Sequence, residues 1–324
     1  MGKDFVHPYM PNSVPEIKQE MLQELGVESI EDIYKSVIPE ELLYKERLDL
    51  PEPILSEHAL KKHVMGILEK NVSTEEYTSF LGAGCYKHQV PALCDEINSR
   101  GEFLTGYCGD TYSDHGKMQA IFEYTSMMGE LLDADVVSYT NYDGGQAVSS
   151  SLRIALRVMR SRNTPKSVLL VPSTMNPEIF AQAREYCRSE GRIDKVAYER
   201  ETGLMDLKDL EERLKSGDVA AVFYENPSYL GFFETRGEKI AELAHKYGAL
   251  CIAQPEVAAL GVMESPMNQG ADLVCGDIQP LGMHIQYGGG QAGFIACQQD
   301  VELIQEFPTY MYGIAKTGEE GRYG

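Results

Sequence analysis

The chain has 324 residues, 43% of them hydrophobic, so it is long enough to bury one large core or two modest ones. Its 29 lysines and arginines stand against 50 aspartates and glutamates, and the formal net charge of -21 disfavours binding to nucleic acid or to anionic membrane surfaces. The first residues contain no apolar signal segment and no apolar run approaches about 18 residues, so we expect a cytoplasmic protein without a membrane span.

Residues 1–75 are predicted to form an N-terminal helical arm. Capping signals at residues 13–16 and at Ser56 mark the starts of helices, and prolines such as Pro39 divide them. We expect a segment divided in this way to wrap around a larger body rather than to build a deep core of its own. The remainder, residues 76–324, is assigned to one large domain.

Strand-like and helix-like segments alternate along the large domain. The predicted strands are residues 136–139, 167–171, 194–198, 219–224, 249–253 and 271–276, with 292–296 as one more candidate. The predicted helices are residues 146–160, 177 to about 190, 207–215 and 237–247. Asn176 and Pro177 provide an N-cap and a first-turn proline for the second of these helices. This alternation indicates an α/β fold with a mainly parallel sheet sandwiched by helices.

Ligands of such sheets bind beyond the carboxyl ends of the strands, so the loops there hold the candidate site residues. Asp143, Gly144 and Gly145 form a turn between a strand and a helix. The free backbone N–H groups and the dipole of that helix suit a phosphate or another anion. A tight strand-to-helix turn needs glycine in any case, and spacing alone favours this structural interpretation.

A second loop, residues 80–86, precedes the sheet. It contains Gly82, Gly84 and Tyr86, and His88 follows it. A loop of this composition is often functional. A flexible connection into the domain explains it equally well.

Two further polar residues follow predicted strands. Gln254 comes directly after a buried strand, where a side chain can point into a cleft, although polar residues at strand ends are also common solvent caps. His284 is the only ionisable base near the glycines at 288–290, and a lone histidine in such a place is more often packed or solvated than catalytic.

The chain contains no lysine or arginine between Lys246 and Lys316. In a fold whose cofactor chemistry requires a Schiff-base amine after the last parallel strands, this gap removes the nucleophile. The seven cysteines are odd in number and scattered, with no C-x-x-C pair, which is typical of reduced thiols and predicts neither disulfides nor a metal site. Neither Cys85 nor Cys108 has a paired histidine, so a reactive cysteine is not predicted.

Several short segments, in order along the whole chain, carry a family resemblance. They are residues 7–12, 21–30, 38–41, 80–84, 119–124, 142–144 and 276–282. Together they resemble the first subunit of the two-subunit bacterial and archaeal glycine dehydrogenase (decarboxylating), also called glycine cleavage P-protein.

The resemblance implies a fold-type-I subunit related to the pyridoxal 5'-phosphate (PLP) transferases, paired with a beta-type subunit as a heterotetramer. In that family the beta-type subunit holds PLP on its lysine, while the alpha-type subunit shapes the shared active site. Together they decarboxylate glycine, release carbon dioxide and pass the aminomethyl group to the lipoyl arm of H-protein. Aligned by residues 276–282, Gln279 stands where the PLP-binding subunit has its lysine.

The resemblance therefore implies an enzyme that is inactive without its partner, with no catalytic residue in this chain alone. The candidates for a shared cleft are Gly82, Gly84, Tyr86, His88, Asp143, Gly144, Gly145, Gln254, Gln279 and His284. Their expected roles are positioning and shaping, because proton transfer and the Schiff base are assigned to the partner.

The chain departs from the family pattern in three loops. Asn176 replaces a histidine before proline, Ser228 replaces an asparagine, and residues 307–313 replace a Pro-Gly-Arg turn. These departures leave open a divergent paralogue that acts on another amino acid or carrier, and the missing lysine leaves open a non-catalytic scaffold or regulatory subunit. A standalone aminotransferase or desulfurase is the least favoured alternative. Family members continue into a further C-terminal region beyond residues 321–324.

Overall fold

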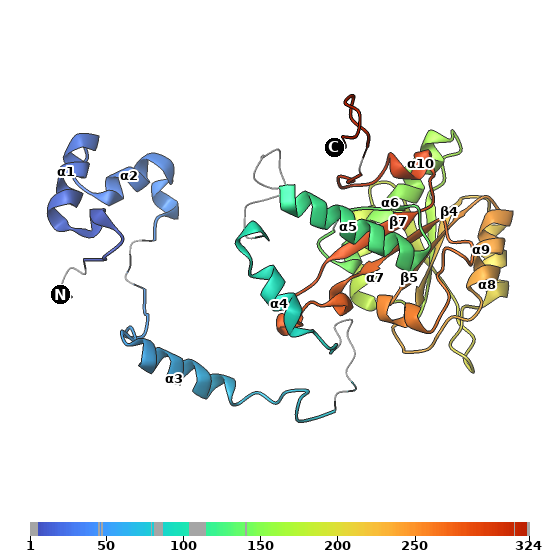
Figure 1. The fold of residues 1–324 in the computed structure, drawn as a ribbon, viewed down its shortest axis with the longest axis horizontal. Helices are drawn as coiled ribbons and strands as arrows, with labels where there is room; N and C mark the ends of the chain where they lie inside the picture. Colours follow the sequence, from blue (N-terminus) through green and yellow to red (C-terminus); the bar gives the residue numbers. More distant parts are fainter. Residues whose placement is uncertain are drawn as a thin grey trace. The chain divides into compact units, whose positions relative to one another are not determined.

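The computed structural model forms two compact units, Met1–Val72 and Ser73–Gly324 (Figure 1). The structure describes residues 6–44, 46, 48–78, 80, 87–103, 115–139, 141–313 and 315–322. Within these residues, no helix combines the length and the apolar character needed to cross a membrane.

The N-terminal unit is helical and has almost no core of its own. Its helices are α1 (Pro15–Leu25), α2 (Ile30–Val37) and α3 (Glu57–Leu68), with the 3-10 turns η1 (Pro11–Ser13) and η2 (Glu40–Leu42). Ser56 caps α3 as predicted. Ser13 does not cap α1, whose N-cap is Val14, and the hydroxyl of Ser13 donates a hydrogen bond to the carbonyl oxygen of Met10 instead. Leu22 is the one buried side chain among the described residues of this unit.

The second unit is built around a seven-stranded sheet. The strands are β1 (Val136–Val137), β2 (Val168–Pro172), β3 (Arg192–Val196), β4 (Val219–Asn226), β5 (Leu250–Pro255), β6 (Leu273–Asp277) and β7 (Gly293–Cys297). Their spatial order is β1-β7-β6-β5-β4-β2-β3. The strands from β6 to β3 run parallel, and β7 runs antiparallel to both of its neighbours. The prediction of a mainly parallel sheet is confirmed.

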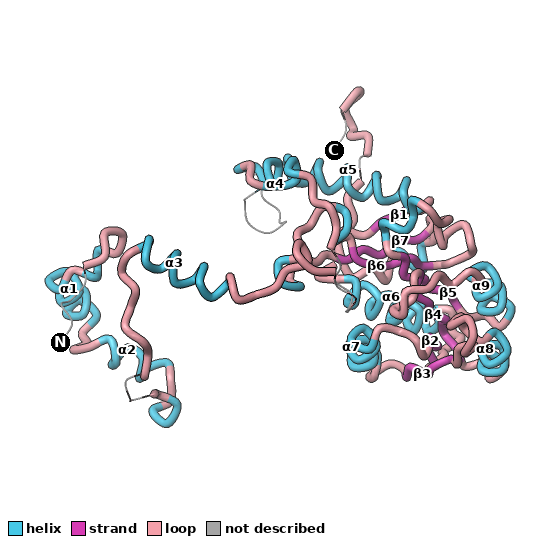
Figure 2. The backbone as a smooth tube through the Cα atoms, turned by 90° about the horizontal axis from the view of Figure 1, so that it is seen from below, coloured by secondary structure: helices cyan, strands magenta, loops and turns pink. Residues whose placement is uncertain are grey.

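Helices cover both faces of this sheet. They are α5 (His115–Leu132), α6 (Gly144–Ser161), α7 (Pro177–Cys187), α8 (Leu207–Leu214), α9 (Gly237–Lys246) and α10 (Val301–Ile304), whereas α4 (Ala92–Asn98) precedes them and buries no side chain. Short 3-10 turns complete the unit: η3 (Gly101–Phe103), η5 (Val257–Gly261), η6 (Gln279–Leu281) and η7 (Gln286–Gly288). Figure 2 shows α7 on one side of the strands and α8 and α9 on the other.

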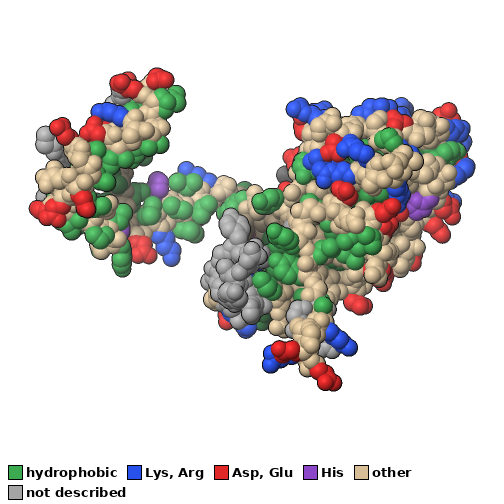
Figure 3. Space-filling model, turned by 90° about the horizontal axis from the view of Figure 1, so that it is seen from above, with side chains coloured by type: hydrophobic (Ala, Val, Ile, Leu, Met, Phe, Trp, Pro, Cys, Tyr) green, Lys and Arg blue, Asp and Glu red, His purple; other side chains and the backbone are tan. Residues whose placement is uncertain are grey.

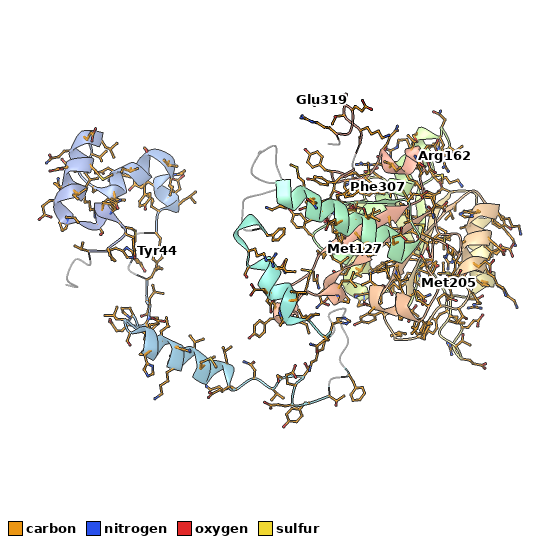
Figure 4. The ribbon with its side chains drawn as sticks, viewed as in Figure 1. Tyr44, Met127, Arg162, Met205, Phe307 and Glu319 are labelled. Carbon is orange, nitrogen blue, oxygen red and sulfur yellow. The ribbon has the colours of Figure 1, made fainter. Side chains whose placement is uncertain are left out.

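The core consists of two hydrophobic clusters, one on each face of the sheet. One cluster contains side chains of α5, α8 and α9, and the other contains side chains of α6, α7 and α10. Successive side chains of a strand point to opposite faces, so Leu170 packs in the first cluster and Leu169 in the second. Arg162, the C-cap of α6, donates a hydrogen bond of 2.7 Å to Glu302 of α10 and ties these helices together (Figure 4).

The predicted order of elements from β1 to β7 is confirmed, and the predicted strand ends differ by at most two residues. The sequence analysis did not predict α4 and α5. The apolar residues of α5 are spread around the helix rather than confined to one stripe, so no helical period marks them.

Candidate functional site

A cleft of about 600 Å³ lies beyond the carboxyl ends of β4, β5 and β6. The N-termini of α6 and α7 supply one wall, and the loop that follows β4 supplies another. Parallel strands end at the same edge of a sheet, which brings residues far apart in sequence into one cleft. This is the edge at which we expected the candidate residues to lie.

The N-terminus of α6 is filled by carboxylates of the chain itself. Asp143 is the N-cap, and its side chain accepts a hydrogen bond of 2.6 Å from the backbone N–H of Gln146. The side chain of Asp277, at the end of β6, accepts a hydrogen bond of 3.0 Å from the backbone N–H of Gly144. A Cβ atom on Gly145 would overlap the amide oxygen of Gln182. Two of the backbone N–H groups that would bind an anion at this turn, those of Gly144 and Gln146, are therefore engaged with acidic side chains.

Glu225 is the most deeply buried carboxyl group of the cleft, with 6% of its surface exposed. Its oxygens accept hydrogen bonds from the backbone N–H groups of Asn176, at 3.0 Å, and Tyr229, at 3.2 Å. Burial raises the pKa of Glu225 to about 7, and the two backbone donors only partly offset this effect. Close to neutral pH this carboxyl group therefore exists in both protonation states.

Two other carboxyl groups of the cleft have raised pKa values. Burial raises the pKa of Asp277 and that of Glu256, although backbone hydrogen bonds oppose the effect at both residues. The nearby His88 also lowers the pKa of Glu256. Glu178 and Asp143 add two more carboxyl groups to the lining. Since the described lining contains no lysine or arginine, the cleft is strongly acidic.

Three buried polar atoms at the cleft have no hydrogen-bond partner among the described residues. They are the hydroxyl oxygen of Ser228, the amide oxygen of Gln254 and the Nε2 atom of His88. Buried polar groups in folded proteins are almost always paired, and an unpaired one in a cleft is a natural contact for a ligand.

The cleft brings together five of the predicted candidates: His88, Asp143, Gly144, Gly145 and Gln254. Gln279 is buried but does not line the cleft, because its amide donates a hydrogen bond of 2.7 Å to the carbonyl oxygen of Met283. His284 is also outside the lining, and its Nε2 atom lies 3.1 Å from the carboxylate of Asp95 on α4. Gly82, Gly84 and Tyr86 lie outside the described residues, as do Cys85 and Cys108.

The sequence analysis missed Glu225, Glu256 and Asp277. The predicted fourth strand stops at residue 224 and the predicted sixth at residue 276, because each apolar run ends at its acidic residue. Both strands continue through these residues, to Asn226 and to Asp277. The available signal was their position: Glu225 and Asp277 each directly follow an apolar run, and Glu256 comes two residues after the predicted candidate Gln254.

The described cysteines are free and mostly buried. Burial raises the pKa values of the thiols of Cys187, Cys275 and Cys297 to about 12, so these groups stay protonated at neutral pH and pack in the core. Among the described residues, no three histidine, cysteine or acidic side chains are arranged to hold a metal ion.

The mainly parallel sheet, the helices on both of its faces and the cleft at its carboxyl edge match an α/β subunit of the fold-type-I PLP-dependent enzymes. The profile of the glycine cleavage system P-protein family matches residues 7–323. The chain belongs to this family.

Similar proteins agree with this assignment. The chain is 38% identical to the probable glycine dehydrogenase (decarboxylating) subunit 1 of Aeropyrum pernix, over 98% of this chain and 68% of that protein. It is 36% identical to the protein of the same name from Pyrococcus horikoshii, over 97% of this chain and 68% of that one. The words "subunit 1" imply a second subunit in those enzymes.

Solved structures agree as well. The crystal structure of an inhibitor-bound glycine decarboxylase (P-protein) matches with a TM-score of 0.79 and 31% identity, over 99% of this chain and 68% of that one. A sphingosine-1-phosphate lyase from Burkholderia pseudomallei shares only the fold, with a TM-score of 0.58 and 11% identity.

Proposed function

We propose that the chain is the alpha-type subunit of a two-subunit glycine dehydrogenase (decarboxylating). In this proposal it acts with a beta-type subunit in PLP-dependent decarboxylation of glycine and in transfer of the aminomethyl group to the lipoyl group of H-protein. Membership of the P-protein family and the similarity to subunit 1 of Aeropyrum pernix support it. We also propose that the pair is a heterotetramer and cytoplasmic.

The residues of this chain's own cleft do not fit PLP. No described lining residue offers an amine for a Schiff base, and Gln279 is turned toward Met283. At the start of α6, where a phosphate would be expected, Asp277 already accepts the N–H of Gly144. The missing amine and the carboxylate at the start of α6 are the observation that carries the proposal. In this proposal PLP and its lysine belong to the partner subunit, and this chain shapes the shared active site and positions its groups.

The surface of the N-terminal unit supports the proposal that the chain binds a partner subunit. Large hydrophobic side chains are exposed along it, visible as green atoms in Figure 3, and include those of Leu25, Val37, Leu42, Leu50 and Leu55. Exposed apolar surface is a feature of interfaces. We therefore assign the contact with the beta-type subunit in part to Met1–Val72.

The test is reconstitution. The chain and a beta-type P-protein subunit are purified separately and together, and glycine-dependent exchange of labelled bicarbonate is measured with lipoylated H-protein. We expect the two chains to co-purify and exchange to require both of them. Glycine-dependent exchange by this chain with H-protein alone would overturn the proposal.

A divergent substrate is the second candidate. Two positions at which the chain departs from the family pattern, Asn176 and Ser228, both line the cleft, which supports a change in what the complex recognises. A panel of amino acids offered to the reconstituted pair decides between the two candidates. Turnover of another amino acid in preference to glycine would favour the divergent paralogue, and normal glycine turnover would exclude it.

A further inference from the structure

We propose that the acidic cleft of this chain binds a small organic cation, a compound carrying a primary ammonium group. The proposal concerns the cleft of the chain itself and does not depend on its role in glycine decarboxylation. The volume of the cleft, about 600 Å³, lies within the range of small-molecule sites.

The charge of the lining selects for cations. Five carboxyl groups from separate parts of the fold line the cleft: Asp143, Glu178, Glu225, Glu256 and Asp277. The one ionisable base in the described lining is His88. Because carboxylates at the cleft repel an anion and attract an ammonium group, the preference of this edge of the sheet is the reverse of that of a phosphate site.

Unpaired acceptors provide the second, independent observation. Ser228 is 9% exposed and lines the cleft, yet its hydroxyl has no partner among the described residues. The amide oxygen of Gln254 is also buried and unpaired there. Gln254 stands beside Glu225 in the register of β4 and β5, so the amide and the carboxyl group lie on the same face of the sheet. An ammonium group has three N–H donors, and these three side chains offer it acceptors.

Two other ligand classes fit less well. An anion would meet the carboxylate of Asp277 at the start of α6, where the N–H of Gly144 is already taken. A metal ion needs several ligands converging on one point, and the described residues contain no such group.

Binding of a cation should also release protons. Burial raises the pKa of Glu225 to about 7, and an ammonium ligand favours the ionised carboxylate. The other ionisable groups that line this cleft are Asp143 before α6, Glu178 on α7, Tyr229 after β4, Glu256 after β5, Asp277 on β6 and His88. A bound cation also opposes the raised pKa values of Glu256 and Asp277, so these two carboxyl groups respond in the same direction as Glu225.

Calorimetric titration of the full-length chain tests the proposal. The probes are butylamine and 1,4-diaminobutane, with 1-butanol as a neutral counterpart and inorganic phosphate as the anion. We expect saturable binding of the amines with one site per chain, proton release near neutral pH, and no binding of the alcohol or of phosphate. Absence of saturable amine binding, or binding of phosphate in this cleft, would overturn the proposal.

Substitutions locate the site. Glu225→Gln removes the negative charge that faces the ammonium group, and Ser228→Ala removes a buried acceptor, so each should weaken amine binding about tenfold. Glu178→Gln, at the edge of the cleft, should weaken it less, and it serves as the acidic variant if Glu225→Gln does not fold. Glu185→Gln, on the same helix α7 but outside the lining, removes the same charge and should leave binding unchanged. Equal effects of the Glu178 and Glu185 variants, with none from Ser228→Ala, would mean that the amine responds only to net charge, and the proposal would fail.

Discussion

Glu225 links the chemistry of the cleft to the stability of the fold. The pKa of this carboxyl group rises from 4.5 to about 7 on folding, so between these values the folded chain binds more protons than the unfolded one. The free energy of unfolding therefore falls as the pH rises through this window and is level above it. A shift of this size is worth about 3 kcal/mol.

Glu225→Gln tests this linkage, because glutamine resembles the protonated carboxyl group. We expect the variant to lose the part of the pH dependence that Glu225 causes. Between acid conditions and pH values above 7, its free energy of unfolding should fall by about 3 kcal/mol less than that of the wild type. Urea unfolding at about pH 5 and pH 8 measures this difference. The exposed Glu185→Gln variant is the control and should keep the wild-type dependence. Parallel curves for wild type and Glu225→Gln would show that burial does not shift this group.

Asn176 is a second residue with a measurable role. Its side-chain oxygen accepts a hydrogen bond of 2.9 Å from the N–H of Glu178 and caps α7. Asn176→Ala should lower the free energy of unfolding by about 1 kcal/mol, whereas Asn176→Ser, which keeps a capping oxygen, should lose only part of that. Urea titration distinguishes these outcomes. Equal losses in both variants would assign the effect to packing instead of capping.

At the scale of elements, β7 holds the start of α6. Gly293 pairs with Asn141 through two backbone hydrogen bonds of 2.8 Å, and a Cβ atom on Gly293 would overlap the backbone carbonyl of Asp143. Backbone cannot move aside as a flexible side chain can. The lack of a side chain at this position therefore allows the first turn of α6 to sit against the sheet.

Gly293→Ala should destabilise the chain by about 1–3 kcal/mol, the usual cost of overpacking. Gly313→Ala is the matched control, because a Cβ atom there meets no other atom within 4 Å. Thermal unfolding of both variants, followed by circular dichroism, measures the effect. An unchanged melting temperature for Gly293→Ala would mean that β7 and α6 adjust freely to each other.

Most elements of the sheet could be predicted because their side chains face hydrophobic clusters on both sides. All residues of β2 and β4 are buried, and the apolar runs 168–172 and 219–224 mark the two strands. The strand ends were less predictable. Glu225 and Asn226 continue β4 because neighbouring segments bond to them, and these partners are up to 49 residues away in sequence.

At the scale of the whole molecule, burial is concentrated in one unit. Both hydrophobic clusters lie within Ser73–Gly324, whereas the described residues of Met1–Val72 bury only Leu22. Burial of apolar surface is the main favourable contribution to folding. The larger unit therefore contains most of the apolar burial that forms within either unit.

Residues 73–324, expressed alone, should unfold cooperatively in urea with nearly the midpoint of the full chain. The full chain should lose additional helical signal at low urea as the N-terminal helices melt. Far-ultraviolet circular dichroism follows both events. A fragment that shows no cooperative transition would mean that the N-terminal unit stabilises the sheet, contrary to this expectation.

The sequence by itself determined the α/β fold, the alternation of strands and helices that gives a mainly parallel sheet, and the absence of lysine and arginine from residues 247–315. Each depends on local periodicity or composition, which can be seen without coordinates. The resemblance carried by short segments such as 276–282 also led to the P-protein family, which the comparison of the whole chain confirmed.

Only the tertiary structure decided what the cleft contains. It brings Asp143, Glu225 and Asp277 together from three separated segments, and it turns Gln279 away toward Met283. The physical reason is that parallel strands gather distant loops at one edge of the sheet, while burial and backbone hydrogen bonds there determine the charge of each carboxyl group. A turn that alone suits an anion thus becomes part of an acidic cleft once Asp277 bonds to Gly144.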